Sequence, residues 1–264
     1  MGQRDGQMNG MVAIVTGASR GLGRAIAREF AHQGASVVIS ARSQSPTGLP
    51  GTIEETVEDI RQAGGEVTAT NCDVTDEAQV DEMVRLAEER YGRIDVLFNN
   101  AGTMVLGESI LEIDPARWDQ LIRVNVGGPY LCSRAVLPVM MEQRRGSIIN
   151  IGSRMATDPA QGGGVLYSAS KAAVHMFSLC LADEVRDYNI AVNILSPGSL
   201  RSEGSAAIPW TQRDWHERVD PSAVGPSAVY LALQDASTFT GQLAARADFG
   251  VTWGPGVQSP GQPT

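Results

Sequence analysis

The side chains best suited to chemistry are one tyrosine and one lysine, four residues apart. Tyr167 and Lys171 delimit the segment YSASK, and Lys171 is the single lysine among the 21 Lys and Arg residues of the chain. Positions i and i+4 of a helix share one face, so a helix here would place the ammonium beside the phenol. A nearby positive charge favours the phenolate and lowers the pKa of tyrosine from about 10. We therefore predict a general acid and base that works near neutral pH.

A serine provides a third candidate group. Ser153 follows an apolar run at 147–151, and its hydroxyl could donate a hydrogen bond to the same substrate oxygen as Tyr167. The spacing Tyr-x-x-x-Lys alone would also fit a core tyrosine and a surface lysine. The interpretation therefore depends on whether the rest of the chain builds a site around these residues.

A glycine-rich segment near the N-terminus is typical of a phosphate-binding loop. The β-rich run at 11–16 leads into TGASRGLG at 16–23, and a helical pattern occupies 21–33. Glycines let the backbone approach a pyrophosphate, and a helix N-terminus supplies N–H groups and a partial positive charge. The spacing G-x-x-x-G-x-G is one residue longer than the usual dinucleotide fingerprint. A turn without a ligand is the alternative.

The end of the second strand indicates which dinucleotide would bind. An Asp or Glu usually follows this strand when the ligand is NAD, because it binds the ribose 2′-hydroxyl. Here no carboxylate lies between Glu29 and Glu54, Arg42 follows Ala41, and Arg20 stands in the glycine loop. Two guanidiniums suit a 2′-phosphate, which they could bind bidentately. We predict NADP(H), with NAD(H) possible and two solvated arginines as the alternative.

Strand-like and helix-like segments alternate along the chain, which predicts one parallel sheet covered on both faces. The predicted strands are 11–16, 36–41, 66–70, 94–98, 147–151, 190–195 and a weaker one at 242–249. The predicted helices are 21–33, 52–63, 76–91, 114–143, 168–188 and 222–234. We expect a polar N-terminal extension at 1–10, a single domain at 11–250, a loop at 43–51 and a flexible Gly/Pro-rich tail at 251–264.

Composition excludes several classes of function. The chain has 264 residues and a net charge of −9, which disfavours binding to nucleic acid or to anionic membranes. The longest nearly apolar stretch, Ala172–Ala182, is too short to span a membrane. The cysteines Cys72, Cys132 and Cys180 are widely spaced, which argues against a disulfide framework and fits a cytoplasmic protein. The scattered histidines His32, His175 and His216 predict structural roles rather than a metal site.

Several motifs together resemble one family. TGASRGLG, CDV at 72–74, NNAG at 99–102, Asn125, Ser153, YSASK and SPG at 196–198 occur in this order. The sequence resembles the short-chain dehydrogenase/reductase family, in its small single-domain branch, over roughly residues 11–250. The resemblance implies a seven-stranded, doubly wound Rossmann sheet with three helices on each face.

The resemblance also implies roles for individual residues. Tyr167 would be the catalytic acid/base, and Lys171 would lower its pKa and bind the nicotinamide ribose. Ser153 would polarise the substrate carbonyl, and Asn125 would hold a water that links Lys171 to solvent. Further cofactor contacts are expected at Gly17, Ser19, Arg20, Gly21, Leu22, Gly23, Arg42, Asp73, Val74, Asn99, Ala101, Gly102, Val124, Pro197, Gly198, Leu200 and Ser202.

These features predict an NADPH-dependent carbonyl reductase, reversible as an alcohol dehydrogenase, that acts on a small ketone or secondary alcohol without a metal. Its partners would be identical subunits, in a homodimer or homotetramer. An NAD-dependent alcohol or hydroxyacyl dehydrogenase is the first alternative, and a non-catalytic nucleotide-binding regulatory protein is the second. Trp210 and Trp215 lie where a substrate lid is expected, at 203–221, and either wall the substrate pocket or simply pack.

Overall fold

The computed structural model describes residues 6–42, 48–158 and 164–257, with the side chains of Pro209 and Trp210 left out. Strands and helices alternate along this part of the chain. In chain order they are β1 (Val12–Thr16), α1 (Gly21–His32), β2 (Ser36–Ala41), α2 (Ile53–Gln62), β3 (Glu66–Asn71), α3 (Glu77–Tyr91), β4 (Val96–Asn99), α4 (Pro115–Ile122), α5 (Gly128–Gln143), β5 (Gly146–Ile151), α6 (Val165–Glu184), β6 (Ile190–Ser196), α7 (Glu203–Ala206), α8 (Gly225–Ala232) and β7 (Leu243–Ala245).

The seven strands form one parallel sheet. Their order is β3-β2-β1-β4-β5-β6-β7, and every neighbouring pair is parallel. All of β1 is buried, because a central parallel strand is covered by helices on both faces. The strand order reverses between β1 and β4, and ligands of such sheets bind beyond the strand ends at this point. The predicted doubly wound, seven-stranded fold is confirmed.

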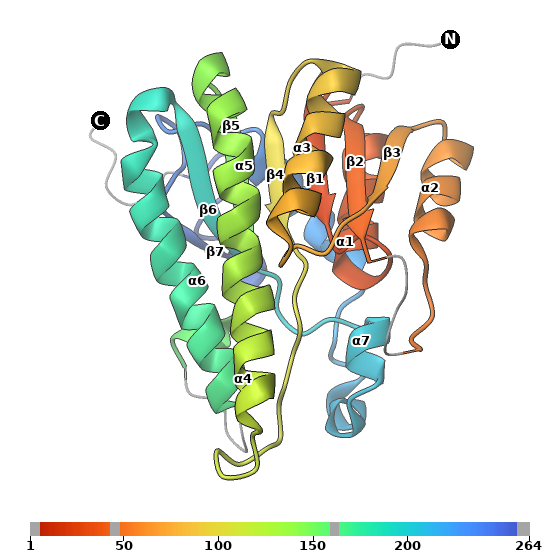
Figure 1. Cartoon of the computed structure of the whole chain (residues 1–264), viewed down its shortest axis with the longest axis vertical. Helices are drawn as coiled ribbons and strands as arrows, with labels where there is room; N and C mark the ends of the chain where they lie inside the picture. Colours follow the sequence, from red (N-terminus) through yellow and green to blue (C-terminus); the bar gives the residue numbers. More distant parts are fainter. Residues whose placement is uncertain (1–5, 43–47, 159–163, 258–264) are drawn as a thin grey trace.

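Helices cover both faces of the sheet (Figure 1). One face packs against α1, α2 and α8 in a cluster that includes Phe30 and Leu231. The other face packs against α3, α5 and α6 in a cluster that includes Val136. Successive residues of a strand enter different clusters, as Ile14 and Val15 do. The sheet is thereby held rigidly between two cores, which fixes the strand ends that carry the site.

The packed domain extends past both predicted ends. Met8, assigned to the N-terminal extension at 1–10, is buried in the first core cluster. Trp253, assigned to the flexible tail at 251–264, is buried and lies against Tyr230 and two other aromatic rings. Burial of these two side chains against distant elements is a tertiary effect that local composition does not reveal.

Three predicted elements differ in detail. The single helix expected at 114–143 contains a π-helical turn at Arg123–Gly127, between α4 and α5. The helix expected from residue 168 begins at Val165, so Tyr167 lies in its first turn. The last strand is only three residues long, within the run predicted at 242–249.

Within the described residues, α6 is the one helix long and apolar enough to cross a membrane by length and composition. A core helix passes the same test. This one buries Leu166, Val174 and Leu181 inside the domain and packs against β6. It also carries the tyrosine and the lysine of the candidate site.

Candidate active site

The glycine loop between β1 and α1 lies at the reversal point of the sheet. Gly17 has a φ of +66°, and a Cβ there would lie 2.9 Å from the Cα of Ala101. A Cβ on Gly23 would lie 2.3 Å from the carbonyl oxygen of Gly17. Asn100 supports the loop, because its Nδ2 donates to the carbonyl oxygens of Thr16 and Gly17. Glycine is therefore required at both positions for a turn that brings α1 close to the strand ends.

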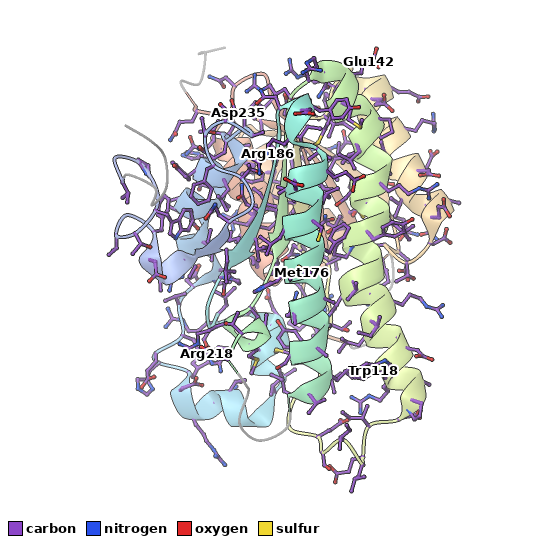
Figure 2. All side chains as sticks on the ribbon, turned by 90° about the vertical axis from the view of Figure 1, so that its left-hand side faces the viewer. Trp118, Glu142, Met176, Arg186, Arg218 and Asp235 are labelled. Atoms are coloured by element: carbon purple, nitrogen blue, oxygen red, sulfur yellow. The ribbon has the colours of Figure 1, made fainter. Side chains whose placement is uncertain are left out.

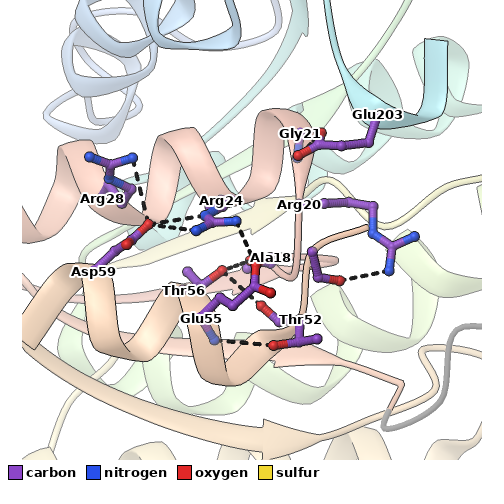
Figure 3. A network of polar contacts seen from close by, with 11 residues as sticks. Ala18, Arg20, Gly21, Arg24, Arg28, Thr52, Glu55, Thr56, Asp59 and Glu203 are labelled. Carbon is purple, nitrogen blue, oxygen red and sulfur yellow. Dashed lines mark hydrogen bonds and ion pairs between the residues drawn. The ribbon is translucent and has the colours of Figure 1, made fainter. Parts of the chain in front are cut away.

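The N-terminus of α1 fits the phosphates of a dinucleotide. Its N-cap, Arg20, gives no side-chain cap, and the first turn holds no acidic residue. Backbone N–H groups at such a helix end bind anions. One anion of the chain already lies there, since Oε2 of Glu203 accepts a hydrogen bond from the N–H of Gly21 at 3.0 Å (Figure 3). Glu203 is a residue at this site that no sequence motif indicates.

The end of β2 carries the two residues, Ala41 and Arg42, on which the prediction of NADP(H) depends. Ala41 is the last residue of the strand and is buried, whereas Arg42 is exposed. Nη2 of Arg20 donates to the carbonyl oxygen of Gly51 at 2.8 Å, which holds Arg20 against the segment that leads into α2 (Figure 3). The end of β2 also meets the glycine loop, because the N–H of Ala18 donates to the carbonyl oxygen of Ser40 at 3.0 Å. The part of the expected loop at 43–47 lies outside the described residues.

Tyr167 and Lys171 share one face of α6, as their spacing predicts. The ammonium of Lys171 lies 5.6 Å from the centroid of the Tyr167 ring. Nζ of Lys171 donates to the carbonyl oxygen of Ile151 at 2.7 Å, and the side chain is only 6% exposed. Burial lowers the pKa of Lys171 to about 8, because a charged ammonium loses its solvation there.

The expected lowering of the Tyr167 pKa is not seen. Burial raises the pKa of this phenol to about 12, and a hydrogen bond from Ser153 opposes the shift. Loss of solvation disfavours the phenolate more than the hydrogen bond from Ser153 favours it. In this structure Tyr167 is therefore a neutral phenol at physiological pH and a weaker acid than a tyrosine in water. Ser153 itself is held by the N–H of Met155, which donates to its Oγ at 3.1 Å.

Asn125 lies buried in the π-helical turn. Its Oδ1 accepts from the N–H of Thr103 at 2.8 Å, and its Nδ2 donates to the carbonyl oxygen of Thr103 and to Oγ of Ser170. Ser170 precedes Lys171 on α6. Asn125 thus joins the turn to α6 and to the chain beyond β4. Its predicted role in holding a water stays a prediction.

The remaining predicted residues lie at the carboxyl ends of the strands, but not all present a side chain. Asn99 is buried, and its Nδ2 donates to Oδ1 of Asn150 at 2.8 Å within the sheet. Asp73 accepts from both the N–H and the hydroxyl of Thr75, which fixes its carboxylate after β3. Val74 packs on Gly128, where a Cβ would lie 2.8 Å from its Cγ2. Ala101 and Gly102 follow β4, where the N–H of Ala101 donates to Oγ1 of Thr16 and Gly102 lies next to Oδ1 of Asn125. Val124 lies in the π-helical turn.

The segment after β6 forms a small unit over the glycine loop. Leu200 pairs with Val219 in an isolated bridge, and Ser202 caps α7 through a capping box with Ser205. Gly198 has a φ of +79°, and the carbonyl oxygen of Pro197 accepts from Arg246. This unit is internally bonded, and it reaches the glycine loop through Glu203.

A groove of about 1030 Å³ lies between this unit and the helices α1 and α2. Its lining includes Arg24, Glu203 and Trp215. Trp215 therefore lines this groove together with residues of α1. The side chain of Trp210 is outside the described part. Within that part, no three His, Cys, Asp or Glu side chains gather as metal ligands would.

The comparisons with known proteins agree with this geometry. An uncharacterized oxidoreductase of Staphylococcus saprophyticus is 35% identical over 240 residues, which cover 91% of this chain and 98% of that protein. A metagenomic short-chain oxidoreductase solved in complex with NADP is 34% identical with a TM-score of 0.74, covering 90% of this chain and 97% of that one. A variant of actinorhodin polyketide ketoreductase solved with NADPH is 29% identical with a TM-score of 0.79, covering 93% and 97%. The family described as short chain dehydrogenase matches residues 11–212. The glycine loop, the Tyr–Lys pair and these matches lead to one conclusion: the chain is an oxidoreductase of the short-chain dehydrogenase/reductase family.

Proposed function

We propose that this protein is an NADPH-dependent carbonyl reductase, reversible as an alcohol dehydrogenase, that acts on a small ketone or secondary alcohol. The observation that carries the proposal is the placement of Tyr167, which is hydrogen-bonded by Ser153 and lies beside the buried ammonium of Lys171. A reductase needs a proton donor at the substrate oxygen, and a protonated tyrosine provides one.

The reaction follows from what these side chains can donate. The nicotinamide, when bound, supplies the hydride. As negative charge develops on the carbonyl oxygen, Tyr167 donates its proton and Ser153 donates a second hydrogen bond. The phenolate that remains is stabilised by the charge of Lys171, which lies on the same helix face. In the oxidative direction the same phenolate accepts the proton of the alcohol. Asn125 positions α6 through Ser170.

Three features support NADP(H) over NAD(H). No carboxylate follows β2, and Arg42 stands next to the buried Ala41. Arg20, in the glycine loop, provides a second guanidinium. Two solved relatives hold NADP or NADPH. Guanidiniums bind phosphate oxygens strongly, whereas a ribose hydroxyl would lack its usual carboxylate acceptor.

A cofactor titration with a panel of carbonyl compounds tests the proposal. Purified protein should oxidise NADPH with simple ketones, β-keto esters or aldehydes, and kcat/KM should be higher with NADPH than with NADH. Preference for NADH with an alcohol substrate would instead identify an NAD-dependent dehydrogenase. Cofactor binding without turnover on any substrate would indicate the non-catalytic regulatory protein.

We also propose that the protein is a homodimer or homotetramer. The outer faces of α5 and α6 expose large apolar side chains, including Tyr130, Met176 and Leu179. Figure 2 shows Met176 on the outward face of α6, beside α5. Such a patch on a charged surface is typical of an interface. Light scattering after size-exclusion chromatography tests this.

A cytoplasmic location is a further proposal, supported by the free cysteines Cys72, Cys132 and Cys180.

A further inference from the structure

Three polar side chains of α6 hold the short segment Ile151–Ser153 at the end of β5. They stand at positions i, i+4 and i+8, so all three share one helix face. Tyr167 is hydrogen-bonded by Ser153, and Lys171 donates to the carbonyl oxygen of Ile151 at 2.7 Å. The third is His175, whose Nε2 accepts a hydrogen bond from the backbone N–H of Ser153 at 3.4 Å. The reaction described above makes no use of His175.

Gly152 leaves the space that the imidazole occupies. A Cβ at this position would lie 2.5 Å from Nε2 of His175 and 2.3 Å from Cγ2 of Ile194. The N–H of Gly152 donates to the carbonyl oxygen of Leu195 at 3.0 Å, so β6 holds the backbone in place. A side chain here would have to push the ring aside. The absence of a side chain at Gly152 therefore makes room for the imidazole of His175.

The environment keeps the imidazole neutral. Burial, and then the charge of Lys171, lower the pKa of His175 below its usual value of 6.5. The ring is 8% exposed, and from the end of β5 it meets Gly152 and Ser153, which carry no charge. The charged group that acts on it is Lys171, one turn earlier on α6. A neutral ring that accepts at Nε2 carries its proton on Nδ1. Protonation would set an N–H donor against the N–H of Ser153 and would break the contact.

We propose that His175 is a positioning residue of the reaction: by accepting the N–H of Ser153, it fixes the backbone from which the Ser153 hydroxyl reaches Tyr167. This inference rests on the proposed function. The hydroxyl of Ser153 has to meet the phenol and the substrate oxygen at once, so a small shift of its backbone weakens both hydrogen bonds. In this role His175 acts through Ser153 and not by contact with the reacting atoms.

Two substitutions at His175 separate positioning from packing. His175→Leu keeps a side chain of similar size but removes the acceptor, and kcat should fall about 5- to 10-fold while the KM for NADPH stays within twofold. His175→Gln carries an amide oxygen that can accept from Ser153, and it should keep most of the parent kcat. His32→Leu, at an exposed histidine of α1, is the matched control and should change nothing.

The acid limb of the pH profile gives a second readout. In the parent, kcat should fall as the pH drops below 6.5, because the neutral acceptor is lost. His175→Gln cannot gain a proton in this range, so its profile should lose that limb. Equal losses of kcat in the Leu and Gln variants, or an acid limb unchanged in His175→Gln, would show that His175 only packs.

A substitution on the other side of the contact covers the case in which His175 variants do not fold. Gly152→Ala should displace the ring and lower kcat to a similar extent, and the double variant Gly152→Ala/His175→Leu should be no worse than the poorer single variant. Full additivity would refute the pairing. If the parent reduces no carbonyl compound, the proposed function fails. The hydrogen bond between Ser153 and His175 can then be measured without activity, by NMR. The amide resonance of Ser153 should then titrate with His175 in the parent and not in His175→Gln, and an amide that does not titrate would overturn the inference.

Discussion

The contact between Glu203 and the N-terminus of α1 predicts that the chain competes with its own cofactor. Oε2 of Glu203 accepts from the N–H of Gly21 at 3.0 Å, where the glycine loop would bind a phosphate oxygen. The cofactor and the carboxylate cannot both use this N–H. Neutralising the carboxylate with Glu203→Gln should therefore tighten the binding of NADPH.

The expected size follows from the exposure of the contact. A carboxylate at a helix N-terminus contributes about 0.3–1 kcal/mol when partly exposed. Glu203 is half-buried, so its charge is screened less than that of a surface residue. The Gln variant loses this charge but keeps an oxygen acceptor. We therefore expect a gain in the free energy of NADPH binding near the upper part of this range. A change of about 0.5–1 kcal/mol corresponds to a roughly two- to fivefold lower Kd.

Titration of NADPH fluorescence measures this Kd directly. The difference between parent and Glu203→Gln should shrink as salt is added, because salt screens the charge on a half-buried group. Glu142→Gln makes the same charge change on an exposed residue of α5, labelled in Figure 2, and should leave Kd unchanged. A Kd that stays the same or rises in Glu203→Gln would refute the competition and would make Glu203 a contributor to binding.

The remaining predictions concern the acid, its neighbour and the choice of cofactor. Tyr167→Phe should lower kcat by roughly 10² or more with little change in NADPH binding, measured by steady-state kinetics and titration. Because burial raises the pKa of Tyr167 to about 12, difference spectra between parent and Tyr167→Phe should show no tyrosinate from this residue below pH 10. Lys171→Arg should lose most activity although it keeps the charge, because a broad guanidinium does not fit where Nζ is buried; near-parental turnover would contradict this. Ala41→Asp should lower the ratio of kcat/KM for NADPH over NADH, and Arg42→Ala should lower it less, since Arg20 remains; an unchanged ratio in both would argue against NADP(H).

Much of the fold could be predicted from the sequence. Central parallel strands are buried on both faces, so they stand out as short apolar runs such as Val12–Thr16, and glycines mark where they turn. The spacing of Tyr167 and Lys171 also predicted correctly that they share a helix face. These features depend on local order along the chain, which the sequence displays.

The features that could not be predicted depend on distant residues. Glu203 contacts Gly21 although 182 positions separate them in the sequence, and no motif near either residue indicates this contact. The importance of His175 depends on a glycine at position 152, on another element. The direction of the Tyr167 pKa was wrong because the sequence shows the nearby lysine but not the loss of solvation, which raises this pKa.

The π-helical turn at Arg123–Gly127 has a consequence for how this chain can be compared and redesigned. A π-helical turn holds one more residue than an α-helical turn, so the helix from Pro115 to Gln143 behaves as a regular helix with one inserted residue. The insertion sits where Asn125 leaves the helix face to bond Thr103 and Ser170. An alignment to relatives without the extra residue would need a gap inside a helix. Restoring ideal α-helical geometry would improve the helix as such and would rotate α4 against α5, which would carry Asn125 away from its partners. The π-helical turn is therefore needed to place Asn125 within hydrogen-bond distance of Thr103 and Ser170.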